Sequence, residues 1–153
     1  MSFRLAAYAV CILDERALLV RHKSGNWTLP GGRVEHAEDP LDTVRREVLE
    51  ETGCHCVVER LLGVDSRIIP AAERAVPGGP EHHNVGIFYQ ARILGGVLTP
   101  EANGETLDVT WTPTSAIAYL RRSSLVDVGL ALAETPPPTG HVDPVSVGGL
   151  IQH

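Results

Sequence analysis

One predicted helix constrains this 153-residue chain more than any other part of its sequence. Asp39 can accept a hydrogen bond as an N-cap, and Pro40 suits the first helical position because its ring already fixes φ near the helical value. Gly53 stands where a left-handed residue commonly ends a helix. The sequence therefore predicts a helix that begins at Asp39 and ends at Gly53.

Three glutamates share one face of this helix. Successive helical residues turn by about 100°, so Glu51 lies roughly 40° from Glu47, and Glu50 lies about 60° from it on the other side. An apolar stripe runs beside them, formed by Leu41, Val44 and Val48. The stripe can pack on a sheet while the carboxylates line a cleft.

Such a cluster of like charges weakens a helix unless something offsets it. Protonation is one way, and a divalent cation is the other, because oxygen-only ligands suit Mg²⁺ or Mn²⁺. Arg46, four residues before Glu50, can also hold a carboxylate in place. The alternative is an ordinary solvated acidic face on the helix.

The residues around the glutamates form a longer pattern with fixed spacing. It comprises Gly32, Glu38, Arg46, Glu47, Glu50, Glu51 and Gly53, followed by apolar Cys54. This pattern resembles the signature box of the Nudix hydrolases, and the preceding WTLPGG (27–32) is similar to the usual lead-in to that box. The order of strands around the box is also similar, over about residues 3–133.

The resemblance implies a fold and a reaction. The fold would be α/β (α+β), an α/β/α sandwich with a mixed central sheet. The reaction would be hydrolysis of a nucleoside diphosphate linked to a further group X, with Mg²⁺ or alternatively Mn²⁺ as cofactor. Glu47, Glu50 and Glu51 would be metal ligands together with the carbonyl of Gly32, and Glu50 or Glu51 would help to deprotonate water.

The resemblance also assigns roles around the metal. Arg46 would orient the glutamates, Glu38 would tie the loop to the helix, and Gly53 would complete the box. A further acidic ligand is expected shortly before a tryptophan, where GETLDVTW (104–111) offers Glu105 or Asp108. We prefer Glu105, because Asp108 can equally be a charge on the surface of a strand.

Residues that select the substrate are expected outside the box. The candidates are Arg21, Lys23, Trp27, Arg67, His82 and His83. The cations can contact phosphate or simply keep the surface soluble. Trp27 can stack on a base or pack under the loop. The histidine pair can reach a nucleotide or form ordinary polar surface.

Strands and helices mix along the rest of the chain. Strands are expected over Phe3–Leu13, 17–22, 54–69 and 85–93, with a long loop over 70–84. Helices are expected over 113–120 and 124–133. The sequence predicts one Nudix-like domain over residues 1–133 and a Pro/Gly-rich tail over 134–153 that is extended or disordered.

Composition narrows the possible partners. The net charge of −6 and the pI near 5.6 argue against a nucleic-acid polymer, which needs clustered Lys and Arg. Cys11, Cys54 and Cys56 lack the spacing of a zinc site, so buried, reduced thiols are expected. No leader and no long apolar run is evident, which predicts a cytoplasmic protein without membrane contact. A homodimer is compatible with the resemblance.

The function predicted from the sequence is a metal-dependent pyrophosphohydrolase. Its substrate would be a small nucleotide diphosphate derivative: an ordinary or oxidised nucleoside triphosphate, ADP-ribose or a dinucleoside polyphosphate. The short chain mildly favours the triphosphate type. Two alternatives remain: a catalytically idle nucleotide-sensing or interaction module, and a hydrolase of a non-nucleotide diphosphate.

Overall fold

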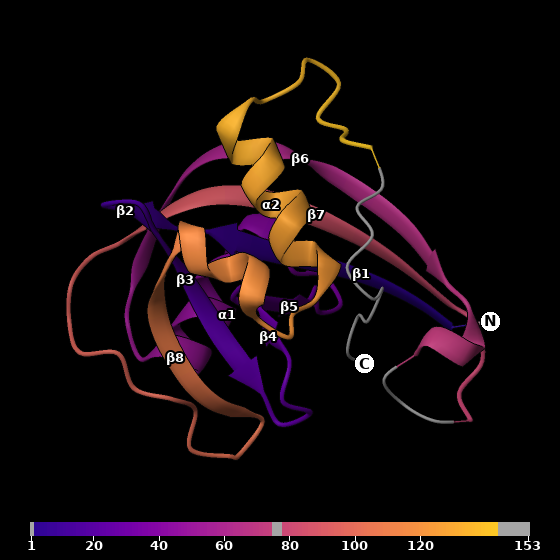
Figure 1. Cartoon of the computed structure of the whole chain (residues 1–153), viewed down its shortest axis with the longest axis horizontal. Coiled ribbons are helices and arrows are strands. Elements are labelled where there is room, and N and C mark those ends of the chain that lie inside the picture. Colours follow the sequence, from indigo (N-terminus) through magenta and orange to yellow (C-terminus); the bar gives the residue numbers. More distant parts are fainter. Residues whose placement is uncertain (1, 75–77, 144–153) are drawn as a thin grey trace.

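The computed structural model describes residues 2–74 and 78–143, and within them two small sheets lie side by side (Figure 1). The first sheet has the order β5-β1-β7-β6, and the second has the order β2-β3-β4 with β8 paired to β3. The first comprises β1 (Ser2–Val10), β5 (Gly31–Arg33), β6 (Cys56–Ile69) and β7 (His82–Ile93). The second comprises β2 (Ile12–Leu13), β3 (Arg16–His22), β4 (Trp27–Thr28) and β8 (Thr106–Pro113).

The first sheet is mixed. Its central pair, β1 and β7, runs parallel from Ser2 opposite His82 to Val10 opposite Gln90. The outer strands β5 and β6 run antiparallel to their neighbours. This confirms the mixed central sheet expected from the sequence.

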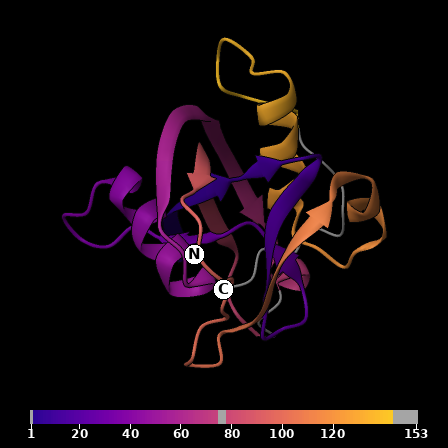
Figure 2. The ribbon, with the colours of Figure 1, turned by 90° about the vertical axis from the view of Figure 1, so that its left-hand side faces the viewer.

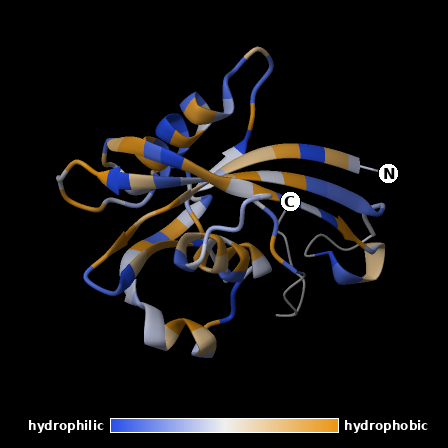
Figure 3. Ribbon diagram, turned by 90° about the horizontal axis from the view of Figure 1, so that it is seen from above, coloured by the Kyte–Doolittle hydropathy of each residue, from blue (hydrophilic) through white to orange (hydrophobic). Residues whose placement is uncertain are grey.

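The helices α1 (Pro40–Thr52) and α2 (Ser124–Glu134) pack against opposite faces of this sheet (Figure 2). Val44 and Val48 of α1 are fully buried against Ala7, Ala9 and Cys11 of the β1 region. The apolar side of α2 packs against the other face in a separate cluster that includes Tyr8, Val10, Phe88, Leu125 and Leu132. Apolar residues, in orange, are interspersed with polar residues, in blue, along the long strands (Figure 3). Residues 6–10 of β1 form an unbroken buried run, as expected for a strand with both faces covered.

The predicted caps of α1 are confirmed. The Asp39 side chain accepts a hydrogen bond from the Leu41 N–H at 2.9 Å, and Pro40 is the first helical residue. Gly53 is left-handed, with φ of +73°, and its N–H donates to the Leu49 carbonyl. Local chemistry therefore fixes both ends of the helix that carries the three glutamates.

The loop predicted over 70–84 and the single strand predicted over Phe3–Leu13 both differ from the structure. The predicted strand is divided, because β1 ends at Val10 and β2 belongs to the other sheet. His82 and His83 do not end a loop over 70–84, because β7 already begins at His82 and pairs with β1 and β6. A short 3₁₀ helix, Ala71–Glu73, also interrupts that segment. The helix predicted over 113–120 is present as a 3₁₀ helix, Thr114–Tyr119. Long-range pairing determines the first of these differences, and the sequence pattern does not report it.

The first part of the predicted tail packs on the domain. The Val64 N–H of β6 donates to the Gly140 carbonyl at 2.9 Å, and Val142 packs against the α2-side core. Residues 144–153 of the predicted tail lie outside the described residues. The division of the chain at residue 133 stays a prediction.

The three cysteines are buried and free, as expected. Burial raises the pKa of the Cys11 thiol to about 12, so this thiol stays protonated. No helix in the described part of the chain is long and apolar enough to cross a membrane. The cytoplasmic location and the homodimer stay predictions.

Candidate active site

Two glycines bring the β5 backbone close to β1 and α1. Gly31 pairs with Tyr8, and a Cβ at Gly31 would meet the Ala7 carbonyl oxygen at 2.3 Å. Gly32 pairs with Ala7, and a Cβ there would meet Glu47 Oε1 at 2.4 Å. Only glycine leaves room for the sheet on one side and for a carboxylate on the other.

Glu51 is anchored at this turn. The Gly31 N–H donates to Glu51 Oε1 at 2.7 Å. Burial raises the pKa of the Glu51 carboxyl well above its ordinary value, and the negative charges of Glu47, Glu101 and Glu50 raise this pKa further. The Gly31 N–H opposes this shift by stabilising the ionised form. A cation beside Glu51 would offset the cost of its charge.

Arg46 links the other two glutamates. Its Nη1 donates to Glu47 Oε1 at 3.0 Å and lies 3.5 Å from Glu50 Oε2. Burial raises the pKa of the Glu47 carboxyl, and the Arg46 charge opposes this shift. Glu50 is more exposed, at 45% of its side-chain surface, than Glu47 at 16%. The contact that the sequence predicts between Arg46 and Glu50 is present.

The rest of the Arg46 fork ties the box loop to α1. Nε and Nη2 donate to the two oxygens of Glu38 at 2.9 and 3.0 Å, and Nη2 also donates to the Arg33 carbonyl at 3.1 Å. Thr43 Oγ1 donates to Glu38 Oε1 at 2.6 Å. This two-bond pairing holds Arg46 in the orientation in which Nη1 reaches the glutamates. Glu38 thus contacts both Arg46 and Thr43 of α1, and the functional roles expected for Glu38 and Arg46 stay predictions.

The ion pair between Glu38 and Arg46 makes the stability of the fold depend on pH in the acid range. Hydrogen bonds from Arg46, and then from Thr43 and the Glu35 N–H, lower the pKa of Glu38 from 4.5 to about 2. A lowered carboxyl pKa adds stability above the unfolded value, and this stability is lost as pH falls through the folded value. We expect Glu38→Gln to lower the melting temperature at pH 7, and the difference from wild type to shrink between pH 4.5 and about 2.

Thermal melts of both proteins across this range measure the effect. Asp42→Asn is the matched control, since Asp42 forms an exposed helix pair with Arg45. Exposed pairs of this kind contribute little to stability. A constant difference between wild type and Glu38→Gln from neutral pH to pH 2 would contradict the account.

The oxygen ligands of the site suit a hard cation, but they are not arranged as a finished metal site. Within residues 2–74 and 78–143, no three acidic, histidine or cysteine side chains converge closely enough to hold an ion. Glu47 and Glu51 instead approach the Gly31–Gly32 turn separately, through contacts with Gly32 and Gly31. The available donors are carboxylate and carbonyl oxygens, which fit Mg²⁺ or Mn²⁺. Glu50 lies at the exposed edge of the same face.

The expected fourth acidic ligand is engaged elsewhere. Glu105 Oε1 accepts from Lys23 Nζ at 2.8 Å, and Glu105 Oε2 lies 3.6 Å from His22 Nε2. Asp108 accepts the N–H of the next residue, Val109, at 2.8 Å. Glu101, which sequence reasoning missed, is the nearby loop residue whose charge acts on Glu51. A ligand role for Glu105 stays a prediction, and Glu101 is a second candidate.

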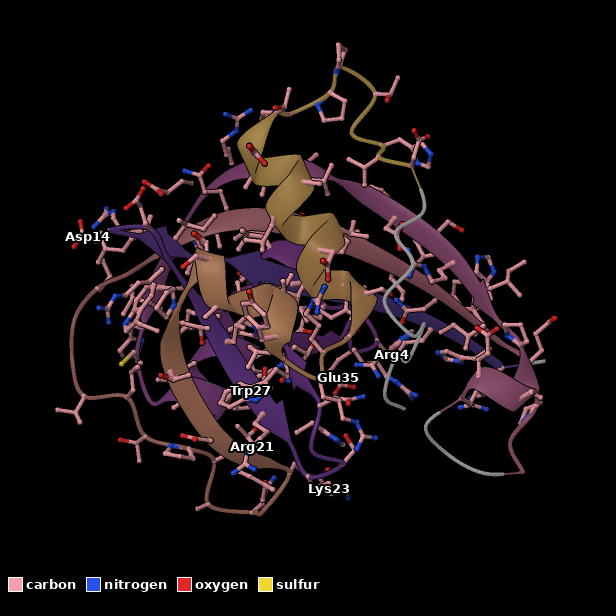
Figure 4. All side chains as sticks on the ribbon, in the orientation of Figure 1. Arg4, Asp14, Arg21, Lys23, Trp27 and Glu35 are labelled. Carbon is pink, nitrogen blue, oxygen red and sulfur yellow. The ribbon has the colours of Figure 1, made fainter. Side chains whose placement is uncertain are left out.

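The candidates on β3 and β4 lie together on one side of the molecule (Figure 4). The Arg21 guanidinium carbon lies 5.8 Å from the centre of the Trp27 ring, so the cation covers one face of the indole. Trp27 also packs against the α2-side core and is only partly buried. Lys23 is exposed and paired with Glu105. Stacking of Trp27 on a base would require Arg21 to move or the opposite ring face to be free.

The remaining candidates belong to β6 and β7. Arg67 lies 3.8 Å from Asp65 and donates to the hydroxyl of Ser124 at the start of α2. His82 Nδ1 lies 2.6 Å from Ser2 Oγ, while His83 Nε2 lies 2.8 Å from Ser66 Oγ. The ring of His83 also packs edge-on against exposed Phe3. His82 and His83 adjoin one another in sequence, but alternation along the strand places them on opposite faces.

A family comparison decides what this arrangement is. The NUDIX domain model matches residues 2–127, which span both sheets and α1. The chain belongs to the Nudix family. The predicted family and fold class are thereby confirmed.

Curated relatives of this Nudix chain include proteins that are named for different substrates. The 8-oxo-dGDP phosphatase NUDT18 from Homo sapiens is 36% identical over 99 residues, which is 63% of this chain and 27% of that protein. The ADP-ribose pyrophosphatase from Methanocaldococcus jannaschii is 36% identical over 89 residues, covering 56% of this chain and 48% of that protein. The chain spans about a quarter to a third of the length of the NUDT18 relatives from three animals.

Solved structures of Nudix proteins share the fold. A NUDIX hydrolase from Nitrosomonas europaea superposes with a TM-score of 0.72 at 20% identity, covering 86% of this chain and 88% of that one. A MutT NUDIX hydrolase from Burkholderia pseudomallei gives a TM-score of 0.60 at 29% identity, covering 74% and 84%. These likenesses confirm the α/β/α arrangement around the Nudix box.

A small cavity of about 50 Å³ adjoins the Nudix box. Gly31 and Glu51 line it together with Arg4, Tyr8 and His22. Sequence reasoning missed Arg4, although a lone arginine in the apolar run FRLAAYAV was a usable signal. A larger hollow of about 330 Å³ lies around the C-terminal end of β1 and is lined by no residue of the box.

Proposed function

We propose that this chain is a divalent-metal-dependent pyrophosphohydrolase that cleaves a nucleoside diphosphate derivative by water attack on phosphorus. The observation that carries the proposal is the arrangement at the Gly31–Gly32 turn. Glu47 and Glu51 meet the turn from α1, and Arg46 holds Glu47 in place. Oxygen ligands beside a small cavity suit a cation that binds together with a phosphate group.

The residues of the Nudix box would each have a separate role in this reaction. Glu47, Glu51 and the Gly32 carbonyl would hold Mg²⁺ or Mn²⁺, with Glu50 completing the set from the exposed edge. The ion would neutralise phosphate charge and lower the pKa of a bound water. The Gly31 N–H keeps one Glu51 oxygen fixed and leaves the other oxygen free to bind the cation or accept a proton. Arg46 keeps Glu47 from turning away.

Relatives guide the choice of substrates to test. Two of the names given above refer to 8-oxo-dGDP and to ADP-ribose. We therefore infer a nucleotide substrate with a diphosphate linkage, and the first panel consists of 8-oxo-dGDP, 8-oxo-dGTP, dGTP, ADP-ribose and a dinucleoside polyphosphate. A non-nucleotide diphosphate completes the panel.

We expect turnover of at least one nucleotide with Mg²⁺ or Mn²⁺. Turnover should be lost when EDTA chelates the metal and should return when metal is added back. Products are separated by ion-exchange chromatography, which also shows which anhydride bond breaks. Binding of a nucleotide without turnover would instead support the sensing module. Turnover of only the non-nucleotide diphosphate would contradict the nucleotide assignment.

A further inference from the structure

Arg4 is a buried cation in the strand that lines the candidate active site. It is the third residue of β1, and 8% of its surface is exposed. Arg4 and Tyr8 point to the same side of β1, toward the cavity that Glu51 also lines. A charged residue so deeply buried normally has a partner of opposite charge.

Arg4 has no such partner among the described residues. Its Nε is buried without a hydrogen-bond acceptor, and none of the described ion pairs includes it. Burial lowers the pKa of the Arg4 guanidinium, while the charges of Glu47 and Glu51 act in the opposite direction. The two carboxylates are thus near enough to act on Arg4 electrostatically but do not bond to it.

A side chain on the neighbouring strand β7 also has a buried polar atom without a hydrogen-bond partner. Asn84 of β7 lies opposite Arg4 in the parallel pairing of β1 and β7, and its side chain is fully buried. Its Nδ2 lies 3.5 Å from Tyr8 Oη, and its Oδ1 has no partner. Buried polar atoms in folded proteins are nearly always bonded. Arg4 and Asn84 thus lie opposite each other, each with one buried polar atom that has no partner among the described residues.

We propose that Arg4 binds a phosphate oxygen of the substrate in the cavity that Glu51 also lines. This proposal rests on the proposed function, since it names the group that would hold the diphosphate while water attacks phosphorus beside the carboxylates and their cation. The planar guanidinium suits a phosphate because it donates several parallel hydrogen bonds. Arg4 and Glu51 line the same cavity, so a group bound by Arg4 would lie beside the Nudix box.

The test compares Arg4→Met and Arg4→Lys with wild type and with Arg92→Gln. Arg92 is exposed and pairs loosely with Glu59 at 3.6 Å, away from the box. The first measurement is calorimetric binding of inorganic pyrophosphate in EDTA. Wild type and Arg92→Gln are expected to bind it, and Arg4→Met is expected to bind about 10–100-fold more weakly, as for loss of a bond to a charged group. Arg4→Lys should fall between them.

Thermal melts separate a binding role from a structural one. If Arg4 serves to bind a ligand, Arg4→Met removes an unpaired buried charge. The melting temperature of the ligand-free protein should then stay unchanged or rise. If Arg4 supports the fold, Arg4→Met should lower that temperature. Pyrophosphate should raise the melting temperature of wild type but not of Arg4→Met.

Four outcomes would overturn the proposal: equal pyrophosphate binding by wild type and Arg4→Met, no binding by either protein, a strong loss of stability in both Arg4 variants, or normal turnover by Arg4→Met. These outcomes are distinct from failure of the proposed function. A wild-type protein that hydrolyses no nucleotide contradicts the function even where Arg4 binds pyrophosphate. Normal turnover by Arg4→Met contradicts only the role of Arg4.

Discussion

Glu51→Gln is expected to reduce kcat/KM for the preferred nucleotide by at least about 100-fold, which corresponds to about 2.7 kcal/mol of transition-state stabilisation. Glutamine keeps an oxygen that can accept the Gly31 N–H, but it removes the negative charge that would bind the cation. Because burial penalises that charge in the metal-free protein, the variant should melt no lower than wild type. Activity and stability should therefore move in different directions.

Glu50→Gln tests the exposed edge of the same face, and it should also reduce turnover by orders of magnitude while the fold survives. Steady-state kinetics at saturating Mg²⁺ and melts in EDTA provide both readouts. Glu59→Gln, an exposed strand carboxylate, serves as the matched control and should keep wild-type rates. If Glu50→Gln and Glu51→Gln both keep wild-type rates, our catalytic assignment is wrong.

Alanine at Gly31 should lower the stability of the fold, whereas alanine at Gly32 should weaken metal binding. In Gly31→Ala the added Cβ would meet the Ala7 carbonyl oxygen at 2.3 Å, at a φ of +151° that side chains rarely adopt. Neither the strand backbone nor this conformation can relax cheaply, so we expect at least about 2 kcal/mol of destabilisation. Melting temperature should fall by roughly 5–10 °C for a domain of this size.

In Gly32→Ala the added Cβ would instead meet Glu47 Oε1 at 2.4 Å and Cδ at 2.6 Å. A side-chain end can move, so stability should change little, but Glu47 would lose its position beside the turn. We expect Mn²⁺ affinity to fall by about 10–100-fold, as for other changes that misplace a ligand.

Calorimetric titration with Mn²⁺ and thermal melts of both glycine variants separate the two effects. Gly25→Ala is the control for positive φ, since it has φ of +93° and nothing within 4 Å of its Cβ. Equal loss of stability in Gly31→Ala and Gly32→Ala, with unchanged Mn²⁺ affinity, would contradict our account of the turn.

Local chemistry made much of the site predictable from the sequence. The N-cap Asp39, Pro40 and Gly53 define the helix through interactions within a few residues, and helical rotation then places the three glutamates on one face. The contact of Arg46 with Glu50 follows from the same geometry. These features depend on neighbours in sequence, so the pattern alone reports them.

Features that depend on distant strands could not be predicted in the same way. Lys23 and Glu105 form an ion pair although they are 82 positions apart, because Arg21 and His22 of β3 pair with β8. His82 and His83 belong to a strand because β7 extends along β1, which hydrophobic alternation from Val85 onward does not indicate. Whether a buried Arg4 finds a partner also depends on elements distant in sequence, and its Nε finds no acceptor among the described residues. Sequence identifies such residues but not their partners.

The central claim is that Glu47, Glu50 and Glu51 gather around a divalent cation at the Gly31–Gly32 turn. A crystal of the protein grown with Mn²⁺ tests it most directly, because the anomalous signal of Mn²⁺ locates the ion independently of any assumption about the ligands. We expect a peak within coordination distance of Glu47 and Glu51 carboxylate oxygens and the Gly32 carbonyl oxygen. A map with these side chains ordered and no peak between them, at Mn²⁺ concentrations that support turnover, would contradict the account.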